Sequence, residues 1–199
     1  DRHTAYGGFS MFDIFDRLRG MVCLMAEKTW CGEQTREIEP ADFVARYETL
    51  SARAGDANPG YVTALPIEDE VPADVKAVGF PYLASIDVRV NSFGSGADLL
   101  AGDVGSFYVA ADGRLGFRRE VYDFSYDYKL PLNEWVNIKL WADNRQTVLI
   151  IDDTYFYYPN NNRNAELKQS STFVLPLERI CEGLDGEYRN LKITENDFD

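Results

Sequence analysis

A chain of 199 residues, 45% of them hydrophobic, is long enough to bury a core of its own, and no apolar run approaches the roughly 20 residues that span a membrane. Asp and Glu outnumber Lys and Arg by 33 to 20, which gives a net charge of −13. Because the acidic residues are spread along the chain, the surface repels phosphate backbones and anionic lipid heads. We therefore expect neither nucleic acid nor a membrane as a partner, whereas neutral glycans stay possible.

The cysteines and the histidine exclude several kinds of site. Cys23, Cys31 and Cys181 are odd in number and lack the CxxC spacing of zinc sites, and His3 is the only histidine. Neither a disulfide framework nor a zinc site is expected, and any mechanism that uses a histidine base would depend on His3.

The opening segment predicts the order helix, strand, helix. Apolar residues at helical spacing between Ser10 and Gly20 predict the first helix, and a second one is predicted to begin at Pro40 and to end near Gly55. Residues 21–26 are apolar without alternation, which is typical of a strand covered on both faces in a parallel sheet. Since such a strand needs neighbours on both edges, the segment is predicted to belong to a repeating β/α fold.

Three stretches of this segment carry a family resemblance: Tyr6-Gly7-Gly8-Phe9, Ala26-Glu27-Lys28-Thr29-Trp30, and the run from Arg46 to Gly60. They resemble the end of the catalytic (β/α)8 barrel of a family 20 glycoside hydrolase, a β-N-acetylhexosaminidase. The resemblance implies that residues 1–60 are the last repeat of that barrel. It also implies that the catalytic Asp-Glu pair lies on an earlier barrel strand, so that this chain alone is inactive.

The same resemblance suggests substrate-binding residues. A tryptophan at the end of the last barrel strand walls the N-acetylhexosamine pocket in that family, and Trp30 matches it. An acidic residue two positions later binds sugar hydroxyls, but Gly32 stands there in this chain, and Glu33 is the nearest match. The alternatives are a buried packing role for Trp30 and a solvated loop position for Glu33.

Residues 61–79 are rich in proline and acidic residues and are predicted to be a linker. From residue 80 the hydrophobic period changes to two, as in the alternation of Ile86, Val88 and Val90 with polar residues. Asp112-Gly113 and Asp152-Asp153 lie between apolar runs and predict hairpins. The chain is therefore predicted to be mainly β, with an antiparallel β-sandwich over residues 80–199.

Further stretches, above all Leu130 to Val136 and Leu184 to Tyr188, resemble laminin G-like, concanavalin A-like domains. The resemblance implies a jelly-roll sandwich of a class that often binds sugars, sometimes with calcium. Two sets of residues are candidates for those roles, aromatic rings on one strand face for glycan stacking and aspartates beside glycines for calcium. The stacking candidates are Tyr122, Tyr126 and Tyr128, and the calcium candidates are Asp98, Asp103 and Asp185. The alternatives are a core row and ordinary turn chemistry.

Together these features predict the C-terminal accessory region of a β-N-acetylhexosaminidase that removes terminal GlcNAc or GalNAc. The expected partners are glycans ending in N-acetylhexosamine and the N-terminal barrel of the same enzyme, and no cofactor other than calcium is expected. Two other readings stay open, a stand-alone carbohydrate-binding module and an adhesion or interaction domain.

Overall fold

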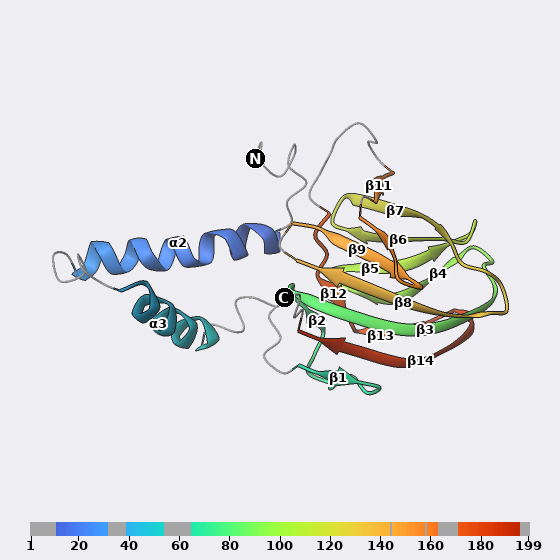
Figure 1. The fold of residues 1–199 in the computed structure, drawn as a ribbon, viewed down its shortest axis with the longest axis horizontal. Coiled ribbons are helices and arrows are strands. Elements are labelled where there is room, and N and C mark those ends of the chain that lie inside the picture. The colour runs from blue at the N-terminus through green and yellow to red at the C-terminus, as the bar shows by residue number, and fades with distance from the viewer. Residues whose placement is uncertain are drawn as a thin grey trace.

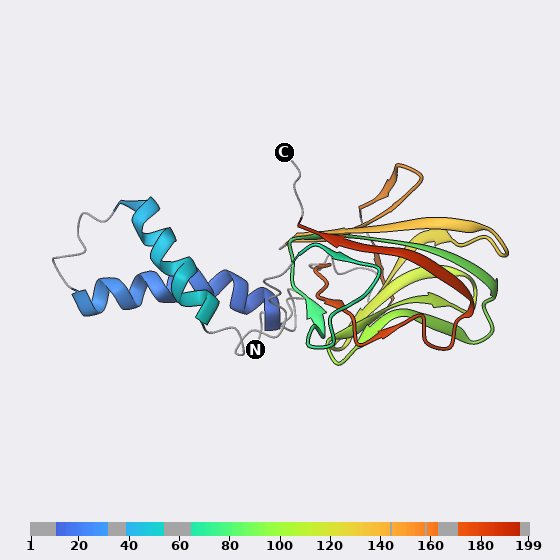
Figure 2. The same ribbon diagram turned by 90° about the horizontal axis from the view of Figure 1, so that it is seen from below.

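The computed structural model describes residues 11–31, 39–53, 65–143, 145–157, 159–162 and 171–195. They form two helices, α2 (Met11–Cys31) and α3 (Pro40–Arg53), followed by a β-sandwich. Figures 1 and 2 show the two sheets of the sandwich facing each other, with the helices crossing at one end and covering neither sheet. Neither described helix is both long and apolar enough to cross a membrane.

Two six-stranded antiparallel sheets make the sandwich, and we call them sheet I and sheet II. Sheet I has the order β1 (Ile67–Glu68), β14 (Asp185–Thr194), β3 (Tyr82–Ser92), β8 (Trp135–Ala142), β9 (Thr147–Ile151), β10 (Thr154–Phe156). Sheet II has the order β11 (Asn160–Asn161), β7 (Tyr122–Lys129), β6 (Arg114–Arg119), β5 (Gly105–Ala110), β4 (Gly96–Gly102), β13 (Arg179–Ile180). A two-stranded sheet joins β2 (Ala77–Val78) to β12 (Leu175–Pro176).

Alternation along the strands places the core between the two sheets. Ile86, Val88 and Val90 of β3 are buried, while the residues between them are half-buried on the outer side.

Both predicted hairpins are present. Gly113 follows β5 with φ +86°, and Asp152 and Asp153 both adopt positive φ between β9 and β10, as a type I′ turn requires. The predicted antiparallel β-sandwich is thus confirmed.

Aromatic rings fill the centre of the sandwich. The Phe117 ring lies 4.8 Å from that of Phe124 and 4.7 Å from that of Phe173, measured between centroids. Two buried tyrosines satisfy their hydroxyls across the core: Tyr82 donates to the carbonyl of Phe173 at 3.0 Å, and Tyr126 donates to that of Thr147 at 2.9 Å. Since a buried hydroxyl without a partner is costly, both bonds stabilise the core, and the bond from Tyr126 of β7 to Thr147 of β9 links sheet II to sheet I.

The stretch predicted as a linker belongs in part to the sandwich. Ile67 is buried in the core, and its strand β1 pairs with β14. Ala77 and Val78 are also buried and form β2. Among the described residues the sandwich therefore starts near residue 65, because apolar residues spaced among prolines and acids reach its core.

The predicted strand over residues 21–26 is wrong: these residues continue α2, which runs through Gly20. An apolar run without alternation fits a buried strand and a helix equally well, and its Met, Leu and Ala residues are strong helix formers. A glycine inside a helix costs only about 1 kcal/mol, so Gly20 does not end it. The described part of the segment is a pair of helices, without the parallel strand of a barrel repeat.

Candidate functional site

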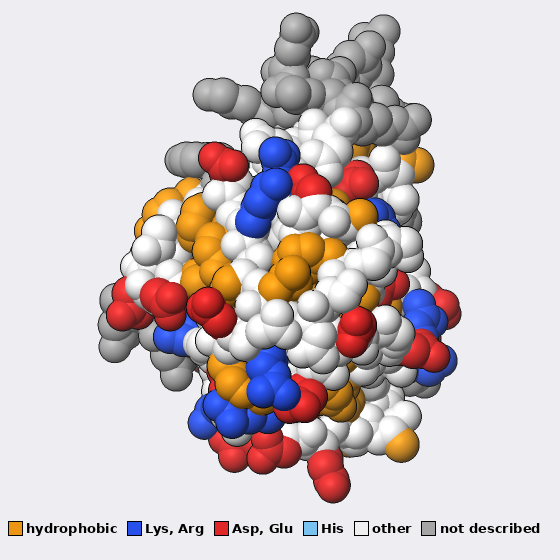
Figure 3. All heavy atoms as spheres, turned by 90° about the vertical axis from the view of Figure 1, so that its right-hand side faces the viewer, with side chains coloured by type: hydrophobic (Ala, Val, Ile, Leu, Met, Phe, Trp, Pro, Cys, Tyr) orange, Lys and Arg blue, Asp and Glu red, His pale blue; other side chains and the backbone are white. Residues whose placement is uncertain are grey.

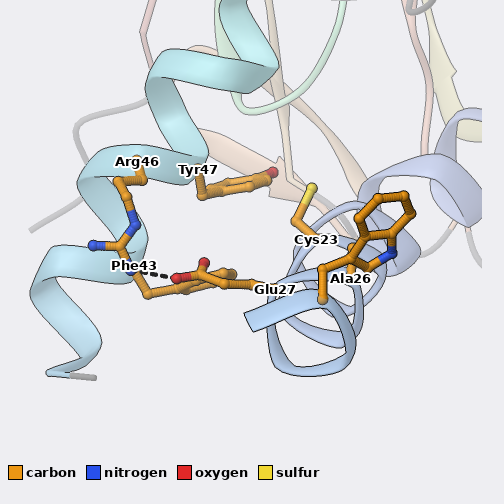
Figure 4. Close-up of a pocket in the computed structure, with 7 residues that line it drawn as sticks. Cys23, Ala26, Glu27, Phe43, Arg46 and Tyr47 are labelled. Atoms are coloured by element: carbon orange, nitrogen blue, oxygen red, sulfur yellow. Dashed lines mark hydrogen bonds and ion pairs between the residues drawn. The ribbon is translucent and has the colours of Figure 1, made fainter. Parts of the chain in front are cut away.

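Trp30 lies in the last turn of α2 and is 89% exposed. It lines an open groove of about 470 Å³ between the two helices. In Figure 4, Phe43 and Tyr47 of α3 face α2 with their rings stacked at 6.1 Å, and Arg46 donates a hydrogen bond of 2.6 Å to Glu27. The groove is thus aromatic with one ion pair. Glu33 lies outside the described residues.

The predicted glycan-stacking row turns out to be part of the core. Tyr122 and Tyr126 are buried, because their side of β7 faces sheet I. The Tyr128 ring packs against that of Phe156 at 5.6 Å. Stacking of Tyr122 and Tyr126 on a sugar is excluded by their burial, and the alternative prediction, a core row, is correct.

The three predicted calcium ligands do not come together. Asp98 and Asp103 lie in and just after β4 of sheet II, whereas Asp185 begins β14 of sheet I. No group of three or more acidic, histidine or cysteine side chains is placed to hold a metal ion among the residues that the structure describes. These three aspartates therefore do not share one calcium site, and calcium binding at any one of them stays a prediction.

The outer face of sheet I carries polar and aromatic side chains side by side. Residues directly opposite each other on neighbouring strands point to the same side, so the register identifies this face. Its four rows are Glu187-Arg89-Trp135, Arg189-Asp87-Asn137, Lys192-Ser85-Lys139-Ile150-Tyr155, and Thr194-Leu83-Trp141-Val148.

Asp87 is the centre of the polar half of this face. Its carboxylate accepts hydrogen bonds of 2.7 Å from Asn137, 2.7 Å from Asn190 and 3.4 Å from Arg189. Burial alone raises the pKa of Asp87, but these donors outweigh it and hold the pKa below its ordinary value. The group is therefore an ionised acceptor that is already engaged by three donors, and it orders the side chains around it.

Trp135 lies at the end of the polar half. The Arg189 guanidinium lies 4.1 Å from the centroid of its ring, and that of Arg89 lies 5.4 Å away. Arg89 also donates to Glu187 at 2.8 Å. The ring is thus held by cation–π contacts, which join it to the network around Asp87.

Tyr155 and Tyr157 form an aromatic pair at the edge of sheet I. Tyr155 is 44% exposed and Tyr157 is 46% exposed, and their rings lie 5.7 Å apart with an angle of 15° between the planes. In the register of the sheet, Tyr155 of β10 lies opposite Ile150 of β9, and Ile150 lies opposite Lys139 of β8. Trp141 lies two residues further along β8. This edge therefore presents nearly parallel rings next to a polar strip.

Sheet II carries a second polar cluster on its own outer face, around Asp123. Its carboxylate accepts hydrogen bonds from the Tyr108 hydroxyl at 2.5 Å, from Asn162 at 3.2 Å and from Arg118 at 3.4 Å. Burial and the nearby Asp123 raise the pKa of Tyr108. The Arg118 guanidinium lies 4.0 Å from the centroid of the Tyr108 ring, so this ring is not free to stack on a ligand.

Charges of both signs are mixed over the end of the sandwich that lies away from the helices, with small apolar patches between them (Figure 3). The aromatic edge and the Asp87 network of sheet I thus remain the best candidate site. It offers flat rings and ordered hydrogen-bonding groups on one face.

The residues of this site were not among the candidates predicted from the sequence. Trp135, Asn137, Lys139 and Trp141 alternate with buried apolar residues along β8, and that alternation was visible in the sequence. The useful signal was an aromatic residue at an outward position of a strand, which the buried row of β7 lacks.

No protein-family model matches the sequence, and no curated protein matches it. Among solved structures the chain is similar to a mutant of Trypanosoma rangeli sialidase displaying trans-sialidase activity, with a TM-score of 0.39, 15% identity, and coverage of 59% of this chain and 21% of that one. Domain 4 of AbnA, a GH43 extracellular arabinanase from Geobacillus stearothermophilus in complex with arabinotriose, gives a TM-score of 0.40 at 15% identity, over 61% of this chain and 63% of that one.

Aspergillus kawachii β-fructofuranosidase complexed with glycerol gives a TM-score of 0.39 at 10% identity, over 74% of this chain and 30% of that one. This chain spans less than two thirds of the length of each of these three structures. Similarity at this level assigns no family.

Proposed function

We propose that the β-sandwich is a carbohydrate-binding accessory domain of a glycoside hydrolase, and that a glycan lies across the outer face of sheet I. The observation that carries the proposal is the exposed, nearly parallel pair Tyr155 and Tyr157 beside the ordered polar strip of β3 and β8. A sugar ring has one apolar face and a rim of hydroxyls, so it needs a flat apolar surface and hydrogen-bonding groups within its own width.

The ordering of this face also favours binding. Asn137 donates both to Asp87 and to the Ser85 hydroxyl, at 2.7 and 3.0 Å, so its amide is held in one orientation. Groups that are already fixed lose little further freedom when a ligand arrives, which raises affinity.

We further propose that the parent enzyme is a family 20 β-N-acetylhexosaminidase, so that the glycans end in N-acetylhexosamine. The support is the sequence resemblance that the stretch from Ala26 to Trp30 and its neighbours bear to that family, although this stretch lies in α2 and not at the end of a strand. In addition, α2 exposes Leu18, Met21, Val22 and Met25, and an exposed apolar surface of this kind is typical of an interface. These helices contact the N-terminal barrel of the parent enzyme in this proposal.

A glycan array followed by calorimetry of the chain tests the proposal. We expect binding to glycans that end in N-acetylhexosamine, and we expect Tyr155→Ala to weaken it about tenfold, as loss of an aromatic anchor does. Tyr188→Ala is the matched control: Tyr188 is 45% exposed but lies opposite the inward-facing Val88, so its side chain is on the other side of sheet I. Absence of glycan binding, or equal effects of the two substitutions, would rule out this site.

A further inference from the structure

Lys139 is the uncommitted cation of the outer face of sheet I. The other three basic residues of the face each have an acidic partner, in the pairs Arg89–Glu187 at 2.8 Å, Arg189–Asp87 at 3.4 Å and Lys192–Glu68 at 2.7 Å. Lys139 forms no ion pair or hydrogen bond through its side chain within the described part of the chain. Its charge is therefore available to a ligand.

The position of Lys139 places this charge inside the proposed glycan site. It is half-buried on β8, directly opposite Ser85 on one side and Ile150 on the other. Tyr155 follows Ile150 in the same row, two strands and about 10 Å away, and Trp141 lies two residues along β8. Lys139 thus lies in the same outer row as the aromatic edge, with the apolar Ile150 between it and Tyr155.

From this arrangement we propose that the outer face of sheet I selects glycans that carry an anionic substituent, a carboxylate or a sulfate ester, which pairs with the Lys139 ammonium. The inference rests on the proposed function, because it concerns the same face. The net charge of −13 repels polyanions from the molecule as a whole, so attraction requires an unpaired cation at the point of contact. An ion pair at a half-buried position is screened less than one in open solvent.

Calorimetry of the whole chain with three hexasaccharides tests this inference. The hyaluronan hexasaccharide carries carboxylates, the chondroitin sulfate hexasaccharide carries carboxylates and sulfate esters, and chitohexaose is neutral. We expect the chain to bind the better of the two anionic glycans about fivefold more tightly than chitohexaose. Lys139→Gln should remove that preference without changing chitohexaose binding, and Lys139→Arg should keep it. The comparison of hyaluronan with chondroitin sulfate identifies the substituent.

Lys76→Gln is the matched control, because Lys76 is the other described lysine without an ionic partner and lies exposed just before β2. Equal affinity for all three glycans, unchanged by Lys139→Gln, would overturn the role of Lys139 and leave the proposed function standing. An equal loss with Lys76→Gln would also overturn it, since the attraction would then be general. Failure of the chain to bind any of the three, or any glycan on the array, would remove the proposed function and this inference together. Thermal unfolding of each variant checks that it is folded.

Discussion

Asp87 is the carboxylate on which the polar half of the candidate site depends, and Asp87→Asn removes its charge while keeping its shape. An asparagine retains one acceptor oxygen, so it keeps one of the two 2.7 Å bonds and turns an NH2 group toward the other donor. One hydrogen bond to a charged group contributes about 1.5–3 kcal/mol to stability. The 3.4 Å pair with Arg189, whose side chain is 55% exposed, adds little because solvent screens it. We therefore expect Asp87→Asn to destabilise the protein by about 2 kcal/mol at pH 7.

The pH dependence of this difference follows from the lowered pKa of Asp87. A carboxyl group whose pKa is lower in the folded state stabilises the protein above its unfolded pKa of about 3.9, and this contribution is lost as the pH falls through the folded pKa. Urea unfolding of both proteins between pH 7 and pH 3 should thus show a gap that is constant down to about pH 4 and then narrows. A gap of the same size at pH 7 and pH 3 would refute the role of the charge.

Two further predictions concern the core and the cysteine near its rim. Phe117→Ala should lower the free energy of unfolding by about 4 kcal/mol, measured in urea, because it empties the centre of the aromatic cluster. The control Val121→Ala, at an exposed position, should change the free energy of unfolding by less than about 0.5 kcal/mol. Similar losses of stability in both variants would contradict the packing described. Burial raises the pKa of the Cys181 thiol to about 12, so in the folded protein the thiol should stay protonated at pH 8 and react slowly with a thiol reagent. In urea the exposed thiol should react much faster. Mass spectrometry of the labelled peptide measures both rates. Rapid labelling of Cys181 in the native protein would contradict that burial.

The sandwich could be predicted because its strands alternate strictly and its turns carry specific residues. Ile86, Val88 and Val90 point to one side whatever the tertiary structure, and Asp152-Asp153 favours the left-handed backbone of a tight hairpin. Residues 21–26 have no such periodicity, so the sequence could not distinguish a helix from a buried strand there. Helix α2 is what these residues form in the described chain.

The candidate site was harder to predict. The alternation of residues along a strand shows which side chains share a face, but it does not show which of the two faces is buried. Tyr122, Tyr126 and Tyr128 share a face of β7, and only the packing of sheet II on sheet I shows that this face is the core. The site also depends on strand order: Lys139 and Tyr155 share one row because β9 pairs with both of their strands. Such neighbours cannot be derived from local spacing.

The position of β14 between β1 and β3 has a consequence for how the polypeptide reaches its native state. Residues 83–92 pair with residues 185–194, so the β14 side of β3 stays open until about 100 intervening residues have been made and arranged. Until then β3 has an unpaired edge that can recruit a strand from another molecule. Slow refolding, with aggregation that increases with protein concentration, is therefore the expected behaviour of this topology.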